Sequence, residues 1–113
     1  MDTKTVNGVT VVTLVKRFDS DTAPGIESAL KELMANGTRK IVCDFSSVEY
    51  INSTGLRVLL SAVKTMAASK GAVGMCSLSP HVRNVFEMAG FTKIFRIFLS
   101  CDEAVRALAD PVI

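Results

Sequence analysis

The chain has 113 residues, of which 49% are hydrophobic and 21% charged, and its formal net charge is +2. This balance predicts one packed globular domain over residues 1–113 and excludes an intrinsically disordered chain. The small net charge, with scattered Lys and Arg residues, argues against a nucleic-acid-binding surface. No apolar run approaches the roughly 18 residues that a membrane span requires, so no membrane association is expected.

Three cysteines, Cys43, Cys76 and Cys101, are spaced without a metal-binding or redox pattern. The N-terminal Met-Asp-Thr-Lys lacks the apolar core of a signal peptide. We therefore expect a cytoplasmic protein with reduced cysteines. Cys43 and Cys76 are expected to be small apolar residues within strands. No metal or cofactor is expected.

The first half of the chain predicts a hairpin, a helix and a strand. Asn7-Gly8 is typical of a type I′ turn and centres a hairpin over residues 2–15, whose second arm is apolar on both faces and suits the middle of a sheet. A polar break over residues 18–24 precedes a helix that ends at Asn36-Gly37. Its apolar stripe is Ile26, Ala29, Leu30, Leu33 and Met34. A buried strand is expected over residues 40–45.

The second half alternates helices and strands. A helix with the stripe Leu56, Leu59, Leu60, Val63 and Ala67 should end near Lys70-Gly71, before a strand over residues 72–76. Ser79-Pro80 should start the next helix, with the stripe Val82, Val85, Phe86 and Ala89, and Gly90 should end it. The only histidine, His81, is expected to be exposed there.

A last strand is expected over residues 93–99. Ser100 and Glu103 match a capping box at the start of a short helix that carries Ala104, Val105 and Leu108 and ends at Asp110-Pro111. The resulting order is ββαβαβαβα. Three strand–helix–strand crossovers imply an α/β fold with a mostly parallel sheet, an N-terminal hairpin and four helices.

The stretch from Asp44 to Arg57 joins a buried strand to a helix through a polar loop. Asn52, Ser53 and Thr54 at the end of the loop are all residue types that cap helices. The amino end of a helix also favours negative charge. Ser53 could therefore be a simple helix cap or a serine that accepts a phosphate, and the residues alone leave both open.

Asp44-Phe45-Ser46 and Tyr50-Ile-Asn-Ser-Thr-Gly-Leu56 resemble the phosphorylation loop of STAS-domain anti-sigma factor antagonists. The chain has Asn52 where the family usually has Asp. Arg17-Phe-Asp19, Ala23-Pro24, Gly90-Phe91, Ile94-Phe95 and the residues from Ser100 to Ala104 also fit the family, as does the order of elements. The resemblance therefore covers nearly the whole chain.

By this resemblance Ser53 is the phosphorylated residue, and Thr54 is a residue of the helix start. Asp44 and Ser46 are expected to shape the loop. Gly55 could let a partner's backbone approach closely. Two further residues complete the expected site: Arg57, one turn after Ser53 on the same helix face, and Asn52, as a cap or as part of the surface that a kinase reads.

The resemblance implies a non-enzymatic binding module that sequesters an anti-sigma factor and so frees a sigma factor. The partner would also be an ATP-dependent serine kinase that phosphorylates Ser53, and a metal-dependent serine phosphatase would reset the switch. Two alternatives are a STAS scaffold in another signalling complex and a small hydrolase or nucleotide-binding enzyme using Asp44 and Ser53. Neither a nucleophile elbow nor a phosphate-binding glycine loop accompanies these two residues.

Overall fold

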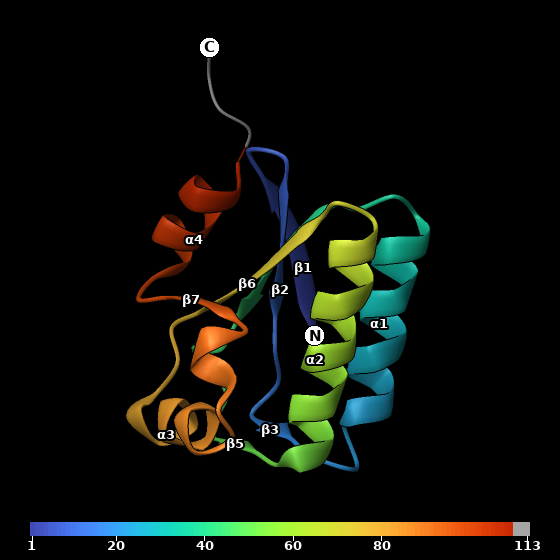
Figure 1. Cartoon of the computed structure of the whole chain (residues 1–113). Coiled ribbons are helices and arrows are strands. Elements are labelled where there is room, and N and C mark those ends of the chain that lie inside the picture. Colours follow the sequence, from blue (N-terminus) through green and yellow to red (C-terminus); the bar gives the residue numbers. More distant parts are fainter. Residues whose placement is uncertain (110–113) are drawn as a thin grey trace.

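The structure, a computed structural model, describes residues 1–109 and is built around a five-stranded sheet of order β1-β2-β4-β6-β7 (Figure 1). These strands are β1 (Asp2–Val6), β2 (Val9–Thr13), β4 (Lys40–Asp44), β6 (Ala72–Cys76) and β7 (Arg96–Phe98). The pair β1–β2 is antiparallel, and each later pair is parallel. Asn7 and Gly8 have φ angles of 51° and 79°. The predicted hairpin and the interior place of its second arm are therefore confirmed.

Helices cover both faces of the sheet: α1 (Ala23–Ala35), α2 (Ser53–Ala68), α3 (Pro80–Met88) and α4 (Cys101–Leu108). The helices α1, α2 and α3 share one apolar core with sheet residues such as Ile41 and Cys43. The last helix, α4, packs on Val11, Val42 and Cys76 of the opposite face. Neighbouring strand residues point to opposite faces, which explains why Cys43 and Cys76 belong to different layers. No helix among residues 1–109 has the length and apolarity that a bilayer crossing requires.

Two helix stripes differ from those expected. Ala67 and Ala89 are exposed, and α2 instead buries Val58, Ala62 and Met66. The stripe of α2 continues at i+3 and i+4 from Leu59, so it turns away from Ala67 as the helix proceeds. Ser79 and Ser100 cap the later helices as predicted, since Ser79 accepts from the amide of Val82 and Ser100 from that of Glu103. Of the capping box predicted at Ser100, the structure shows this serine half.

The last strand is shorter than expected. Residues Phe91–Lys93 form a 3₁₀ turn, and only Arg96–Phe98 are extended. The amide of Phe95 donates to the carbonyl of Phe91, and the two rings lie 5.2 Å apart. The segment therefore coils to bring its aromatic side chains together after Gly90, whose φ of 76° ends α3 as predicted. The expected helix end at Asp110-Pro111 lies outside the described residues, and α4 ends at Leu108.

A second, two-stranded sheet was not expected. Its strands are β3 (Arg17–Phe18) and β5 (Tyr50–Ile51), which pair in parallel at the end of the molecule where α2 begins (Figure 1). The carbonyl of Phe18 also accepts a hydrogen bond from the amide of Asn52. This small sheet ties the loop before α2 to the segment before α1.

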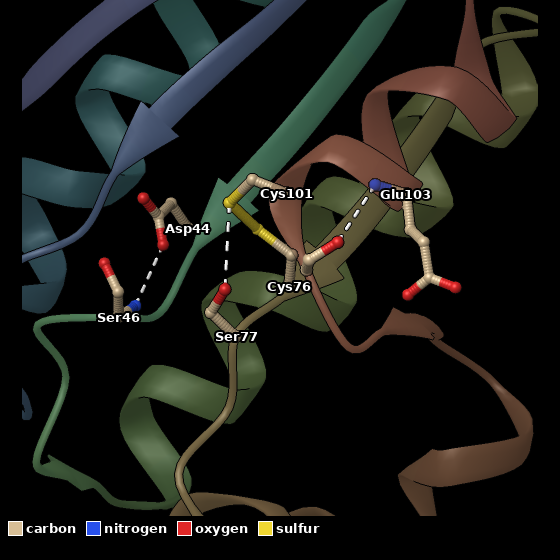
Figure 2. The surroundings of a disulfide bond; sticks show 7 residues. Asp44, Ser46, Cys76, Ser77, Cys101 and Glu103 are labelled. Atoms are coloured by element: carbon tan, nitrogen blue, oxygen red, sulfur yellow. Dashed lines mark hydrogen bonds between the residues drawn. A yellow bond between two sulfur atoms is a disulfide. The ribbon is translucent and has the colours of Figure 1, made fainter.

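The cysteine predictions are partly wrong. Cys43 is a free, buried residue of β4, as expected. Cys76 and Cys101 instead form a disulfide between the end of β6 and the start of α4 (Figure 2). They are 25 residues apart in the sequence. At that separation no short sequence motif could have predicted the disulfide. The two residues meet only because α3 and β7 fold between them.

Candidate functional site

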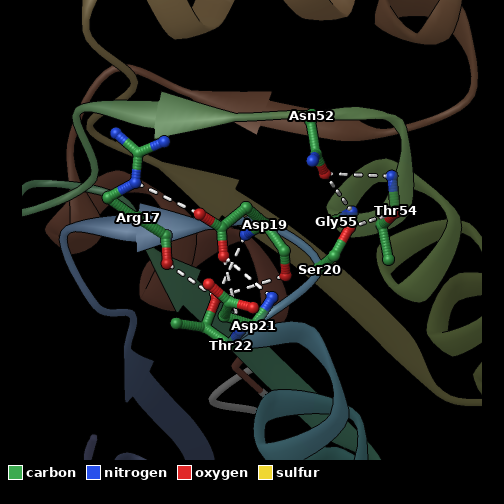
Figure 3. A network of polar contacts seen from close by, with 8 residues as sticks. All are labelled: Arg17, Asp19, Ser20, Asp21, Thr22, Asn52, Thr54 and Gly55. Carbon is green, nitrogen blue, oxygen red and sulfur yellow. Dashed lines mark hydrogen bonds and ion pairs between the residues drawn. The ribbon is translucent and has the colours of Figure 1, made fainter.

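Asn52 holds the start of α2. Its extended backbone places the side chain over the first turn, where Oδ1 accepts from the amide of Thr54 at 3.0 Å and from that of Gly55 at 3.2 Å (Figure 3). These are two of the amides that a helix start leaves unpaired. Asn52 is therefore the helix cap, and the reading of Ser53 as the cap is wrong.

Ser53 is the first residue of α2, and its side chain is exposed. Its hydroxyl makes no hydrogen bond to any residue in the described part of the chain. The first turn of α2 holds no acidic residue. The hydroxyl thus projects into solvent at the positive end of a 16-residue helix, where an added anion is favoured.

Thr54 is placed differently. It is half-buried, and its hydroxyl lies 3.2 Å from the hydroxyl of Ser20, on the segment before α1 (Figure 3). A hydrogen bond between these hydroxyls joins the two loops at the base of the helices. Of the two neighbouring hydroxyls, only that of Ser53 is both exposed and free of a described partner.

Gly55 is buried under the small sheet. A Cβ atom there would lie 2.8 Å from the carbonyl oxygen of Phe18 and 2.9 Å from a side-chain carbon of Ile51. The close approach that glycine permits is therefore used by Phe18 of the same chain. This packing sets how α2 leaves the loop.

Asp44 and Ser46 shape the beginning of the loop, as expected for Asp44. The Asp44 carboxylate accepts a hydrogen bond of 2.9 Å from the amide of Ser46 (Figure 2). Ser46 contributes its backbone rather than its hydroxyl, which is exposed. Asp44 points toward α4 and the disulfide, on the sheet face opposite α2, so the structure does not bring it together with Ser53.

Arg57 is exposed one turn after Ser53. It lines a shallow pocket of about 340 Å³ between the first turns of α1 and α2. Ser20 and Thr54 line the same pocket. The positively charged side chain of Arg57 therefore lies next to the surface that carries Ser53.

Polar residues of the small sheet extend this surface, and most of them were not among the expected site residues. Arg17 bonds Asp19 at 3.1 Å, and its guanidinium lies 4.4 Å from the centroid of the Tyr50 ring. Burial works to raise the pKa of the Asp19 carboxyl. Hydrogen bonds from Arg17 and from the amides of Asp21 and Thr22 outweigh it and hold that pKa below its usual value. Two-residue strands show no periodicity, so the hydrophobic pattern does not predict this network, although the family resemblance includes Arg17-Phe-Asp19 and Tyr50.

Metal-ligating atoms gather at one place among residues 1–109. The side-chain donors of Asp44, Cys76 and Cys101 lie within 4.8 Å of one another. Both sulfurs are used in the disulfide, so no thiolate ligand is available while that bond is intact.

Comparisons that cover most of the chain identify its family. The model of the STAS domain family matches residues 1–104. BtrV of Bordetella bronchiseptica, assigned as an anti-sigma factor antagonist, is 35% identical over 102 residues, which are 90% of this chain and 88% of BtrV. The anti-sigma-F factor antagonist RsfB of Mycobacterium tuberculosis is 29% identical over 99 residues, 88% of this chain and 80% of RsfB.

A solved structure gives the same result for the fold. The crystal structure of an anti-sigma factor antagonist from Mycobacterium paratuberculosis superposes with a TM-score of 0.87 at 29% identity, covering 96% of this chain and 92% of that one. The chain belongs to the STAS-domain family, among the anti-sigma factor antagonists, which are non-enzymatic binding modules.

Proposed function

We propose that this protein is a cytoplasmic anti-sigma factor antagonist whose partner binding is switched by phosphorylation of Ser53. The observation that carries the proposal is the state of the Ser53 hydroxyl, which is exposed and unbonded among the described residues at the first position of a capped helix. Relatives over most of the chain are named as antagonists of anti-sigma factors.

The partner in this proposal is an anti-sigma factor with ATP-dependent serine kinase activity. The unphosphorylated protein binds it, and the sigma factor is released. The kinase then transfers the γ-phosphate of ATP to the Ser53 oxygen, and ADP leaves. A metal-dependent serine phosphatase hydrolyses the phosphoserine and restores the binding form.

The physical effect of the phosphate is local. It adds about −1.5 to −2 charges at neutral pH. The helix start and Arg57 favour this charge within the protein. A partner that covers Ser53 must desolvate the phosphate, which disfavours the complex. The fold is therefore retained while association weakens.

The STAS scaffold remains the second candidate, because the same exposed loop could hold a partner without being modified. The phosphorylation switch and the scaffold differ in one observable result, which is whether a bound kinase phosphorylates Ser53. The enzyme alternative has no support from the site, since Asp44 and Ser53 lie on opposite sheet faces.

Phosphosite mapping tests the proposal. The full chain is incubated with the ATPase that co-purifies with it and with ATP. Trypsin releases residues 41–57 as one peptide that contains Ser46, Ser47, Ser53 and Thr54. Fragmentation should place the phosphate on Ser53, and Ser53→Ala should abolish it. Ser28→Ala, which changes an exposed serine on α1, is the matched control and should leave modification unchanged. Phosphate on Thr54 would contradict the assignment, and a bound but inactive partner would favour the scaffold.

A further inference from the structure

The disulfide between Cys76 and Cys101 has no place in the proposed switch. We propose that these residues form a reversible dithiol–disulfide pair, which oxidised glutathione closes and reduced glutathione opens. Cys76 is the last residue of β6, and Cys101 is the first residue of α4. Their bond is therefore a covalent clasp between the sheet and α4 (Figure 2).

The two cysteines differ in exposure. Cys76 has an exposed fraction of 0%, whereas Cys101 is half-buried. The hydroxyl of Ser77 lies 3.9 Å from the Cys101 sulfur and can donate to it (Figure 2). Of the two cysteines, we therefore expect glutathione to attack or be attacked at Cys101. Disulfides with an exposed sulfur are the more readily exchanged ones.

Cys43 provides an internal contrast. Complete burial raises the pKa of its thiol to about 12. It points into the α1–α2 core, on the sheet face opposite the clasp. Cys43 should stay a thiol under conditions that change the other two cysteines.

The chemistry balances with glutathione as the named reactant. The Cys101 thiolate attacks one sulfur of glutathione disulfide, forming a mixed disulfide and expelling one glutathione thiolate. The Cys76 thiol then loses its proton and attacks the Cys101 sulfur, expelling the second glutathione thiolate. Two protein thiols are oxidised, and one glutathione disulfide is reduced to two glutathione molecules. Reduction runs the same steps backwards.

The clasp acts on α4. This helix is the only one on its sheet face among residues 1–109, and it is held there by Ala104, Val105 and Leu108. Breaking the disulfide removes the covalent link and leaves α4 held on the sheet by non-covalent contacts such as these. An anti-sigma factor antagonist would meet glutathione in the cytoplasm, where disulfides are usually transient or redox-sensing, and to that extent the inference rests on the proposed function.

Redox titration of the isolated full chain tests the clasp without any partner, so its outcome is independent of the Ser53 switch. The protein is equilibrated in glutathione buffers, quenched with acid, alkylated and digested with trypsin. A closed clasp links the peptides of residues 71–83 and 97–106, while Cys43 lies in the peptide of residues 41–57. As [GSH]²/[GSSG] falls by about a hundredfold, the fraction of protein with linked peptides should rise from roughly one tenth to nine tenths.

Three results would overturn the proposal: no link at any ratio, a link that survives the most reducing buffer, or pairing of Cys43. Thermal melting gives a second readout. Oxidised wild type should melt roughly 10 °C above reduced wild type, because the bond closes a long loop. Cys101→Ser, or Cys101→Ala if that variant folds better, should melt at one temperature in both buffers. An equal redox shift in either variant would assign the effect elsewhere.

Discussion

The cap at Asn52 gives the sharpest prediction about how the site is built. Asn52→Ala removes both hydrogen bonds that its Oδ1 accepts, at 3.0 Å from Thr54 and 3.2 Å from Gly55. Loss of such a cap costs about 0.5–2 kcal/mol. Thr54 is half-buried and Gly55 is buried, so the freed amides are poorly placed to bond water instead. We therefore expect the free energy of unfolding to fall by about 1–2 kcal/mol, toward the upper end of that range.

Urea unfolding followed by circular dichroism measures this change, and a melting temperature lower by roughly 4–8 °C should accompany it. Asn52→Asp is the matched control, because a carboxylate can accept from the same two amides. It should unfold like wild type or be stabilised by about 0.3–1 kcal/mol through the helix dipole. If Asn52→Ala unfolds within about 0.3 kcal/mol of wild type, Asn52 is not the cap.

Three further predictions concern the same end of the molecule. Gly55→Ala would place a Cβ 2.8 Å from the carbonyl oxygen of Phe18, so urea unfolding should show a loss of about 1–3 kcal/mol; unchanged stability would contradict the packing. The pKa of Asp19 is lowered, so its stabilisation is present above the ordinary value of 3.8 and is lost as pH falls through the folded value. In thermal melts over a series of pH values, Asp19→Asn should lose less melting temperature at acid pH than wild type does. If the variant loses as much as wild type, other groups cause the acid destabilisation. Asn52→Asp should be phosphorylated faster than wild type in single-turnover kinetics, because it places a carboxylate beside the acceptor Ser53 for the kinase to recognise; an equal or slower rate would show that Asn52 does not slow the reaction.

Most of the fold was predictable because its signals are local. The Asn7-Gly8 turn, the capping serines Ser79 and Ser100, and the alternation of strands with amphipathic helices are each encoded within a few residues. The helix stripes wrongly included Ala67 and Ala89, where alanine fits an exposed helix position as well as a buried one, and they missed the buried Val58, Ala62 and Met66 of α2. The parallel order of the sheet follows from the right-handed crossovers that those helices require.

What could not be predicted depends on contacts between distant segments. Arg17–Phe18 pairs with Tyr50–Ile51 because the fold brings the segment before α1 next to the loop before α2. Each strand has only two residues, which is too few to show a hydrophobic period. Choosing the cap among Asn52, Ser53 and Thr54 required the backbone geometry, since all three types cap helices. The partnership of Cys76 and Cys101 depends on the placement of α4.

In the proposed switch, a phosphate on Ser53 weakens binding to the anti-sigma factor without unfolding the protein. Calorimetric titration of the anti-sigma factor into the unphosphorylated chain and into the stoichiometric Ser53 phosphoprotein measures it directly, and a thermal melt of each form reports the fold. Ser28→Asp, with a negative charge on α1 away from the loop, controls for net charge. We predict similar melts and a dissociation constant raised at least tenfold by the phosphate, about 1.4 kcal/mol or more, with Ser28→Asp near wild type. Equal affinity of the two forms would contradict the switch, and a phosphoprotein that loses binding only because it unfolds would contradict its local mechanism.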